Sequence, residues 1–130
     1  MQIQTKLSKK YFELLVFILK RQKIDIIFNY LDEILKTENI SGVIFYFLKI
    51  LDNLILLASV SKYNKNINEI CKIINQSEYF VYQNLSLLKD LDYDFLIEFR
   101  KKIFDFQYEY DNLKEYTIYF FVCSLFNKKL

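Results

Sequence analysis

Three aspartates at alternating positions come closest, among all side chains of the sequence, to the spacing of a chemical site. Asp90, Asp92 and Asp94 have the spacing with which a calcium-binding loop opens. The sixth position of such a loop requires glycine and is Phe95 here, and the twelfth requires glutamate and is Lys101. We therefore interpret the three carboxylates as capping and first-turn residues of a helix, and we predict no metal site.

The composition excludes most familiar active sites. The chain of 130 residues has no histidine, no proline and one glycine, Gly42. Without histidine there is no imidazole base for a serine or cysteine nucleophile, and no histidine-containing zinc site. One glycine is too few for a phosphate-binding loop, because such loops need several positions where the backbone approaches phosphate without a Cβ. We therefore expect no enzyme activity, no catalytic residues, no cofactor and no small-molecule substrate.

The segment 67–88 has the outline of a helix-turn-helix, with a short helix, a polar turn at 75–77 and a second helix. A DNA-binding helix of this kind needs donors for base edges and cations for phosphates. Gln83 and Asn84 have side chains that can read adenine, but Lys89 is the only cation at this helix. We predict a packing hairpin, and the alternative is a helix-turn-helix DNA-binding regulator.

Charge and cysteine content predict a cytoplasmic protein without a membrane span. The 18 basic and 16 acidic residues are interspersed, which is too balanced for binding to nucleic acid or a membrane surface by charge alone. The basic clusters 20–23 and 100–102 are interpreted as solvated. Cys71 and Cys123 lack metal-ligand spacing and are interpreted as reduced core residues. The apolar run 42–61 has Lys49 and Asp52 in its middle, which indicates a core helix.

The spacing of apolar residues predicts an all-α single domain over residues 1–130, a bundle of about seven helices with an internal hairpin. We expect these helices over about 8–21, 24–37, 41–61, 66–75, 77–88, 92–110 and 113–127. The predicted N-terminal caps are Ser8, Ser41, Asn66 and Ser77, and the predicted left-handed residue is Asn75. The predicted inward residues of the second helix are Ile24, Phe28, Leu31 and Leu35, those of the fourth are Ile67, Ile70, Cys71 and Ile74, and those of the fifth are Phe80, Val81, Leu85 and Leu88.

Two helices have more apolar surface than one core contact uses. The helix 93–110 has a first apolar stripe through Leu96 and Ile103, and a second stripe of Ile97, Phe104 and Tyr108 on another face. The last helix is apolar almost all round. A helix with such a surplus in a small bundle indicates a shared face, and interface cores are rich in aromatic residues. The predicted interface residues are Phe104, Tyr108, Tyr116 and Tyr119.

An ordered series of segments runs through nearly the whole chain. A Phe-led short helix begins at Phe12, and a polar joint at 20–23 and a helix ending in paired aliphatics follow. A long apolar helix with leucines near its end comes next, then a hairpin with Tyr79 and Phe80 just past its turn, two further helices and a leucine-rich terminus. From about Phe12 to Leu130 the chain resembles the C-terminal collar domain of the delta subunit of the bacterial DNA polymerase III clamp loader. It departs from that family at Asn53 and in the few basic residues of its hairpin.

The resemblance implies a function. Delta subunits of that family lack ATPase activity; their N-terminal region binds the sliding clamp, and their C-terminal domain joins those of sister subunits in a pentameric collar. This chain would then be the non-catalytic collar part of a delta-like subunit in DNA replication, without the clamp-binding region. Its partners would be the delta-prime and gamma/tau-like subunits, with DNA involved only indirectly. A generic small helical protein-interaction domain from an AT-rich bacterium is the further alternative.

Overall fold

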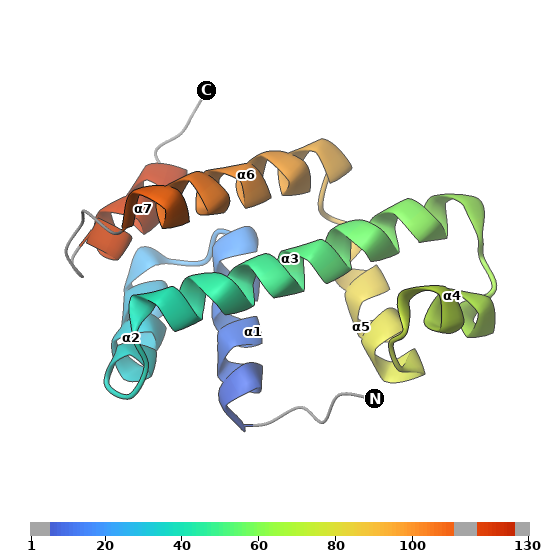
Figure 1. Cartoon of the computed structure of the whole chain (residues 1–130), viewed down its shortest axis with the longest axis horizontal. Helices are drawn as coiled ribbons and strands as arrows, with labels where there is room; N and C mark the ends of the chain where they lie inside the picture. Colours follow the sequence, from blue (N-terminus) through green and yellow to red (C-terminus); the bar gives the residue numbers. More distant parts are fainter. Residues whose placement is uncertain (1–5, 111–116, 127–130) are drawn as a thin grey trace. The chain divides into compact units, whose positions relative to one another are not determined.

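The computed structural model describes residues 6–110 and 117–126, and all regular structure within these residues is α-helical. The described residues form seven helices: α1 (Lys6–Leu19), α2 (Ile24–Leu35), α3 (Ile40–Tyr63), α4 (Ile67–Ile74), α5 (Glu78–Leu88), α6 (Tyr93–Tyr110) and α7 (Thr117–Phe126) (Figure 1). The predicted all-α fold with an internal hairpin is thereby confirmed.

The described residues separate into two compact units. The hairpin unit comprises residues 48–102, and the terminal unit comprises residues 6–47, 103–110 and 117–126 of the described chain. Helices α3 and α6 are each continuous and contribute residues to both units. Whether the chain is a single domain stays a prediction, and each unit is described by itself.

Helix starts follow from short polar side chains that accept a backbone hydrogen bond. The Asn66 side chain accepts from the Glu69 N–H at 3.1 Å, and the Ser77 hydroxyl accepts from the Phe80 N–H at 3.1 Å, so both predicted caps are confirmed. The caps predicted at Ser8 and Ser41 are wrong, because both residues lie inside helices. Asn39 caps α3 instead, with its Oδ1 2.8 Å from the Gly42 nitrogen.

Two helices end at a non-glycine residue in the left-handed conformation. Asn75 follows α4 with φ of 57°, as predicted, and Arg21 follows α1 with φ of 54°, which the sequence pattern did not indicate. After each, the next residue donates its N–H to a carbonyl five positions earlier, Gln76 to Cys71 and Gln22 to Phe17. Glycine is the usual residue here, but the only glycine of the chain lies at the start of α3. Asparagine tolerates this conformation better than arginine.

The core of the hairpin unit joins the second half of α3 to α4 and α5. Leu57, Ile70, Ile74 and Val81 form its buried centre. Its partly buried periphery consists of Val60, Ile67, Cys71, Phe80, Leu85 and Leu88. Of the predicted inward residues of α4, Ile70 and Ile74 are buried, and Ile67 and Cys71 are half-buried against the same core. On α5 Val81 is buried as predicted, whereas the predicted Phe80, Leu85 and Leu88 are half-buried at the edge of the core. The other buried residues of this helix are Asn84 and Leu87, which were not predicted inward.

In the terminal unit α1 packs against α2. The fully buried face of α2 is Ile27, Leu31 and Ile34, whereas the prediction had Ile24, Phe28 and Leu35 beside Leu31. Those three residues are half-buried. Apolar residues cover much of the circumference of α2, so periodicity alone does not select the face that packs. The buried residues that the other helices contribute are Tyr11, Leu14, Leu15, Ile18, Leu19, Ile40, Val43, Ile44, Phe47, Ile103, Phe106, Ile118 and Val122.

Helix α3 is not enclosed on all its apolar sides. The two charged residues within its apolar run, Lys49 and Asp52, are exposed, but Phe45 and Leu56 are exposed as well. Of the helices in the described residues, α3 alone is long and apolar enough to cross a membrane by length and composition. The core helix of a soluble protein passes the same test, so this property is weak support for a span.

Replacing Gly42 with alanine is expected to stabilise the terminal unit by about 0.5–1 kcal/mol, because glycine within a helix costs conformational entropy. A Cβ at this position would lie 3.4 Å from Asn39 Oδ1 and 3.7 Å from the Tyr11 hydroxyl, which are ordinary contacts. Urea denaturation followed by circular dichroism measures the change. Lower stability of the Gly42→Ala protein would show that the start of α3 is packed more tightly than these distances indicate.

Candidate protein-interaction surface

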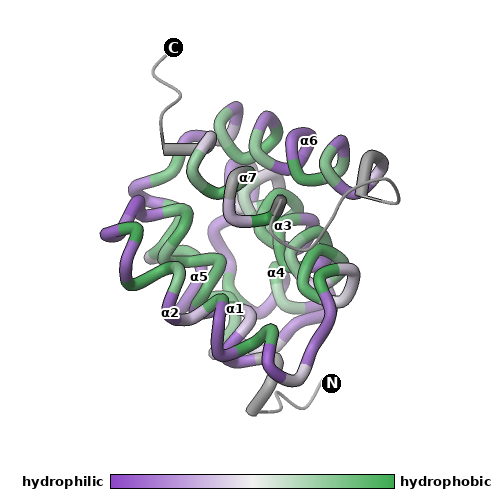
Figure 2. The backbone as a smooth tube through the Cα atoms, turned by 90° about the vertical axis from the view of Figure 1, so that its left-hand side faces the viewer, coloured by the Kyte–Doolittle hydropathy of each residue, from purple (hydrophilic) through white to green (hydrophobic). Residues whose placement is uncertain are grey.

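Helix α6 has two apolar stripes on different faces, as its sequence predicts. The first stripe, Leu96, Phe99, Ile103 and Phe106, is buried. The second stripe is exposed, with 41% of Ile97, 49% of Phe104 and 81% of Tyr108 accessible to solvent. Hydrophobic and hydrophilic positions accordingly alternate along this helix (Figure 2). The second stripe is therefore apolar surface beyond what burial of α6 uses.

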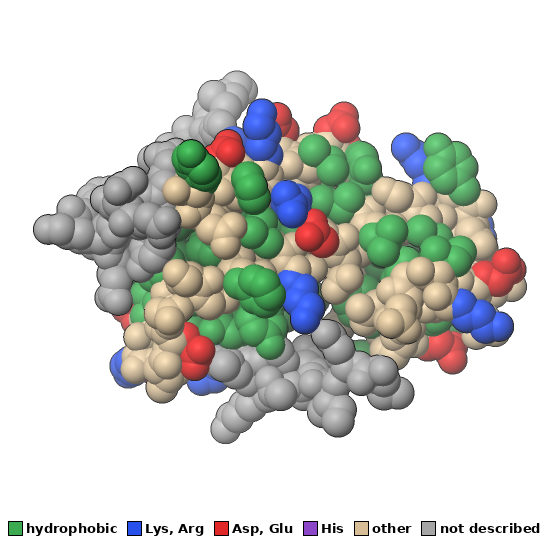
Figure 3. All heavy atoms as spheres, in the orientation of Figure 1, with side chains coloured by type: hydrophobic (Ala, Val, Ile, Leu, Met, Phe, Trp, Pro, Cys, Tyr) green, Lys and Arg blue, Asp and Glu red, His purple; other side chains and the backbone are tan. Residues whose placement is uncertain are grey.

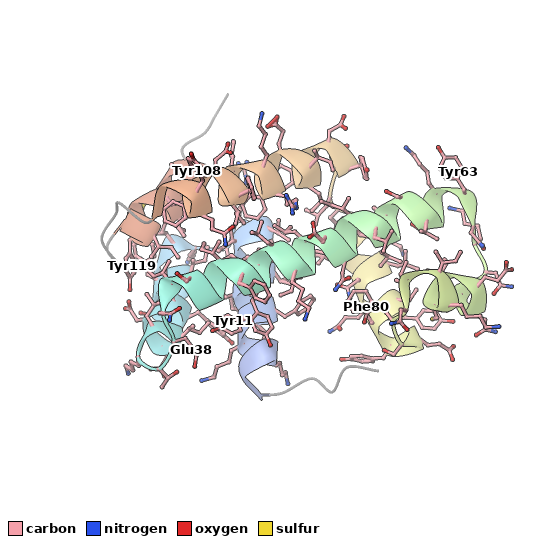
Figure 4. The ribbon with its side chains drawn as sticks, in the orientation of Figure 1. Tyr11, Glu38, Tyr63, Phe80, Tyr108 and Tyr119 are labelled. Carbon is pink, nitrogen blue, oxygen red and sulfur yellow. The ribbon has the colours of Figure 1, made fainter. Side chains whose placement is uncertain are left out.

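Two of the four predicted interface residues thus lie on one exposed face. Phe104 and Tyr108 are one turn apart on α6, and Figure 4 shows Tyr108 on this helix. Large side chains at this spacing present a continuous patch to a partner. We name the exposed positions of α6 at this spacing, Asp94, Ile97, Glu98, Lys101, Phe104, Asp105 and Tyr108, the outward face of α6.

Tyr119 has a role within the terminal unit. It is half-buried on α7, and its hydroxyl donates a short hydrogen bond to Asp32 Oδ1 of α2. Its ring meets Phe28 edge-on, with ring centroids 5.1 Å apart. The residue therefore ties α7 to α2, a tertiary contact that helical periodicity does not reveal. Tyr116, the fourth predicted residue, lies outside the described residues.

The hairpin α4–α5 presents little of what DNA reading requires. Gln83 and Lys89 are exposed on α5, but Asn84 is only 1% exposed. Its amide donates to the Phe80 carbonyl at 2.8 Å, within its own helix. Asn84 is therefore not available to a base edge, and of the two side chains considered for reading adenine only Gln83 is exposed. Among the described residues on the face seen in Figure 3, basic and acidic side chains are interspersed.

Asn84 Oδ1 is buried without a hydrogen-bond partner. A buried unpaired acceptor destabilises the folded state, whereas an apolar side chain of similar size has no such cost. We therefore expect Asn84→Leu to raise the free energy of unfolding by about 1 kcal/mol. Urea denaturation measures this, with Gln83→Leu at the neighbouring exposed position as a control that changes little. A loss of stability in Asn84→Leu alone would show that Oδ1 has a partner, such as bound water.

The three aspartates Asp90, Asp92 and Asp94 lie at and just before the start of α6. All three residues are exposed, Asp92 lies directly before α6, and its carbonyl accepts from the Leu96 N–H at 3.1 Å. Asp94 lies in the first turn of α6, where a carboxylate stabilises the helix dipole. Within the described ranges no group of three or more Asp, Glu, Cys or His side chains is placed to hold a metal ion.

The basic clusters differ from one another. Lys20, Arg21 and Lys23 are exposed at the joint between α1 and α2, as predicted. Arg100 is not simply solvated, because its Nε donates to Asp52 Oδ1 at 2.6 Å and its Nη2 to Oδ2 at 3.4 Å. This two-point contact ties α6 to α3 within the hairpin unit. Such ion pairs at a protein surface contribute up to about 1 kcal/mol to the free energy of unfolding.

Tyr11 is the centre of a polar contact that the sequence pattern did not reveal. The residue is 1% exposed, its ring stacks on Tyr46 with centroids 4.5 Å apart, and its hydroxyl donates to Glu38 Oε1 at 3.3 Å (Figure 4). Burial and the nearby Glu38 carboxylate together raise the pKa of Tyr11 to about 12. Tyr11 shares the buried face of α1 with Leu14, Leu15 and Ile18, and a tyrosine in such a stripe needs a hydrogen-bond partner. A tyrosine within an otherwise aliphatic stripe was therefore the one feature of the sequence that could have indicated this contact.

A second tyrosine of the terminal unit is held in a similar way. The Tyr30 hydroxyl donates to Glu13 Oε1 at 3.3 Å, and its ring meets Phe17 edge-on at 5.0 Å. Partial burial and the Glu13 carboxylate raise the pKa of Tyr30. Both tyrosines join α1 to neighbouring segments. They are structural contacts.

The two cysteines are free thiols, and both are half-buried. Cys71 packs at the edge of the hairpin-unit core.

No known protein family, no curated protein and no solved structure matches this chain. Function must therefore be inferred from the surface itself together with the resemblance seen in the sequence.

Proposed function

We propose that this chain is a non-catalytic helical interaction module, the collar part of a cytoplasmic delta-like subunit of a DNA polymerase III clamp loader. The observation that supports this most is the exposed apolar stripe on α6. A soluble chain that works alone has little reason to keep Phe104 and Tyr108 at a surface, since exposed apolar patches favour association. A subunit that joins others through this helix needs such a stripe.

The resemblance supplies the identity of the partners. It implies delta-prime and gamma/tau-like subunits, which would bind through their own collar domains. Aromatic residues are frequent among the few positions that dominate the affinity of an interface. Phe104 and Tyr108 are therefore the positions at which we expect truncation to weaken assembly most.

Co-purification tests the proposal. The full-length protein that contains this sequence is tagged and co-expressed with the other clamp-loader subunits and the sliding clamp of the same organism. We expect the subunits to co-purify, and Phe104→Ala with Tyr108→Ala to reduce their yield at least about tenfold. The matched control replaces two exposed tyrosines of the hairpin unit, Tyr63 and Tyr79, with alanine and is expected to keep the complex.

Absence of both the subunits and the clamp from a folded preparation would reject the clamp-loader assignment. Circular dichroism of each variant confirms that it is folded. If other proteins co-purify and depend on Phe104 and Tyr108, the chain is an interaction domain of another assembly. Salt-dependent binding to duplex DNA that is lost in Gln83→Ala and Lys89→Ala would instead support the regulator alternative.

A further inference from the structure

The outward face of α6 has the spacing of a helix-pairing seam. Ile97, Lys101, Phe104 and Tyr108 follow one another at intervals of four, three and four residues, and all are exposed. This is the spacing of core positions in two helices that pack along their length. Because α6 is one continuous helix, the helix itself sets the order of these side chains along the face. The shape of this face is therefore suited to a partner helix.

Charge beside the seam is mostly negative. Glu98 and Asp105 are exposed, seven residues apart, and so lie on the same flank of the seam. Asp94 continues the exposed acidic series toward the start of α6. Lys101 is the one exposed cation of the outward face, because Arg100 beside it pairs with Asp52. Flanking charges of this kind set which helix a seam accepts.

A second copy of the chain is a poor occupant of this face. Two α6 helices can pair antiparallel, with Ile97 of one copy against Tyr108 of the other. This arrangement brings Glu98 of one copy next to Asp105 of the other. Parallel pairing places the two Lys101 side chains in the same layer. Like charges placed opposite one another oppose association.

We infer that the outward face of α6 receives an amphipathic helix of another protein, with lysine or arginine flanking its apolar seam. This inference rests on the proposed interaction function and defines the chemistry of the partner. The apolar seam of the partner covers Ile97, Phe104 and Tyr108. The lysine or arginine residues of the partner lie along Glu98 and Asp105. Lys101 repels any cation that the partner places directly opposite it.

Two synthetic three-heptad peptides test the inference. They share one apolar seam and differ only in carrying lysine or glutamate at the flanking positions. Fluorescence anisotropy with the full chain is expected to show at least about tenfold tighter binding of the lysine peptide, with the difference shrinking as salt rises. The variant Glu98→Lys with Asp105→Lys is expected to reverse the preference. The control, Glu69→Lys with Glu78→Lys on α4 and α5, is expected to leave it unchanged.

The outcomes separate this inference from the proposed function. Equal affinity for both peptides, or binding of neither, overturns the inference even if the clamp-loader subunits co-purify. A lysine preference that reverses with Glu98→Lys and Asp105→Lys supports it even if those subunits do not co-purify. A dimer in sedimentation equilibrium that Phe104→Ala with Tyr108→Ala dissociates would identify a second copy as the occupant, and would also overturn the inference.

Discussion

Truncation of Leu57 to alanine is expected to lower the free energy of unfolding of the hairpin unit by about 2–5 kcal/mol. Leu57 is fully buried and is the α3 residue at the centre of a core that also contains Ile70, Ile74 and Val81. Its removal leaves a cavity among α3, α4 and α5, where the loss of packing adds to the loss of hydrophobic transfer free energy. Urea denaturation measures the total, and amide hydrogen exchange in α4 and α5 shows whether the loss is local.

The neighbouring leucine provides the matched control. Leu56 is 42% exposed on the same helix, so Leu56→Ala removes an identical group from a position with much less packing. Its expected cost is within about 1 kcal/mol. Equal costs for the two substitutions would mean that α3 is rotated from the orientation described here. A larger cost for Leu56 would place the core on the opposite side of the helix.

The hairpin could be predicted from sequence because local interactions specify it. Asn66 and Ser77 mark the starts of α4 and α5, and Asn75 marks the end of α4, each through hydrogen bonds within five residues. Apart from the exposed Ile73, the apolar residues of α4 follow a helical spacing of three and four, which favours one face for burial. Local signals of this kind do not depend on what packs against the hairpin.

Faces of the more apolar helices could not be predicted in the same way. Helix α2 has apolar residues on most sides, and contact with α1 selects Ile27 and Ile34 over Ile24 and Phe28. On α5 tertiary packing buries Asn84, a polar residue that was not among the predicted inward residues. In both helices tertiary packing decides between faces that periodicity leaves equivalent.

The candidate surface was predictable where it depends on one helix. The stripe of Ile97, Phe104 and Tyr108 follows from the sequence of α6 alone, since a second apolar face remains after the first is assigned to the core. Tyr119 shows the limit of this reasoning. Its contacts with Asp32 and Phe28 join residues about ninety positions apart, which no periodicity within α7 can indicate.

The Tyr11 contact leads to an expected pH dependence in the alkaline range. The pKa of Tyr11 is raised from 10.0 to about 12 by burial and by the Glu38 carboxylate, so the folded chain retains this proton when the unfolded chain has lost it. Stability from this contact is fully present below pH 10 and is lost as pH rises through 12. The expected loss is about 2 kcal/mol across this range.

Tyr11→Phe isolates this effect, because it removes the ionisable hydroxyl of this one residue and leaves every other side chain in place. The variant keeps the stacked ring on Tyr46 but loses the hydroxyl that donates to Glu38. At neutral pH its expected cost is about 1 kcal/mol, the contribution of one hydrogen bond. Between pH 9 and about 11.5 its free energy of unfolding, measured in urea, should fall less steeply than that of the native chain. Parallel slopes for the two proteins would mean that Tyr11 ionises as easily in the folded chain as in the unfolded one. The packing of α1 against the turn before α3 would then leave this hydroxyl open to water.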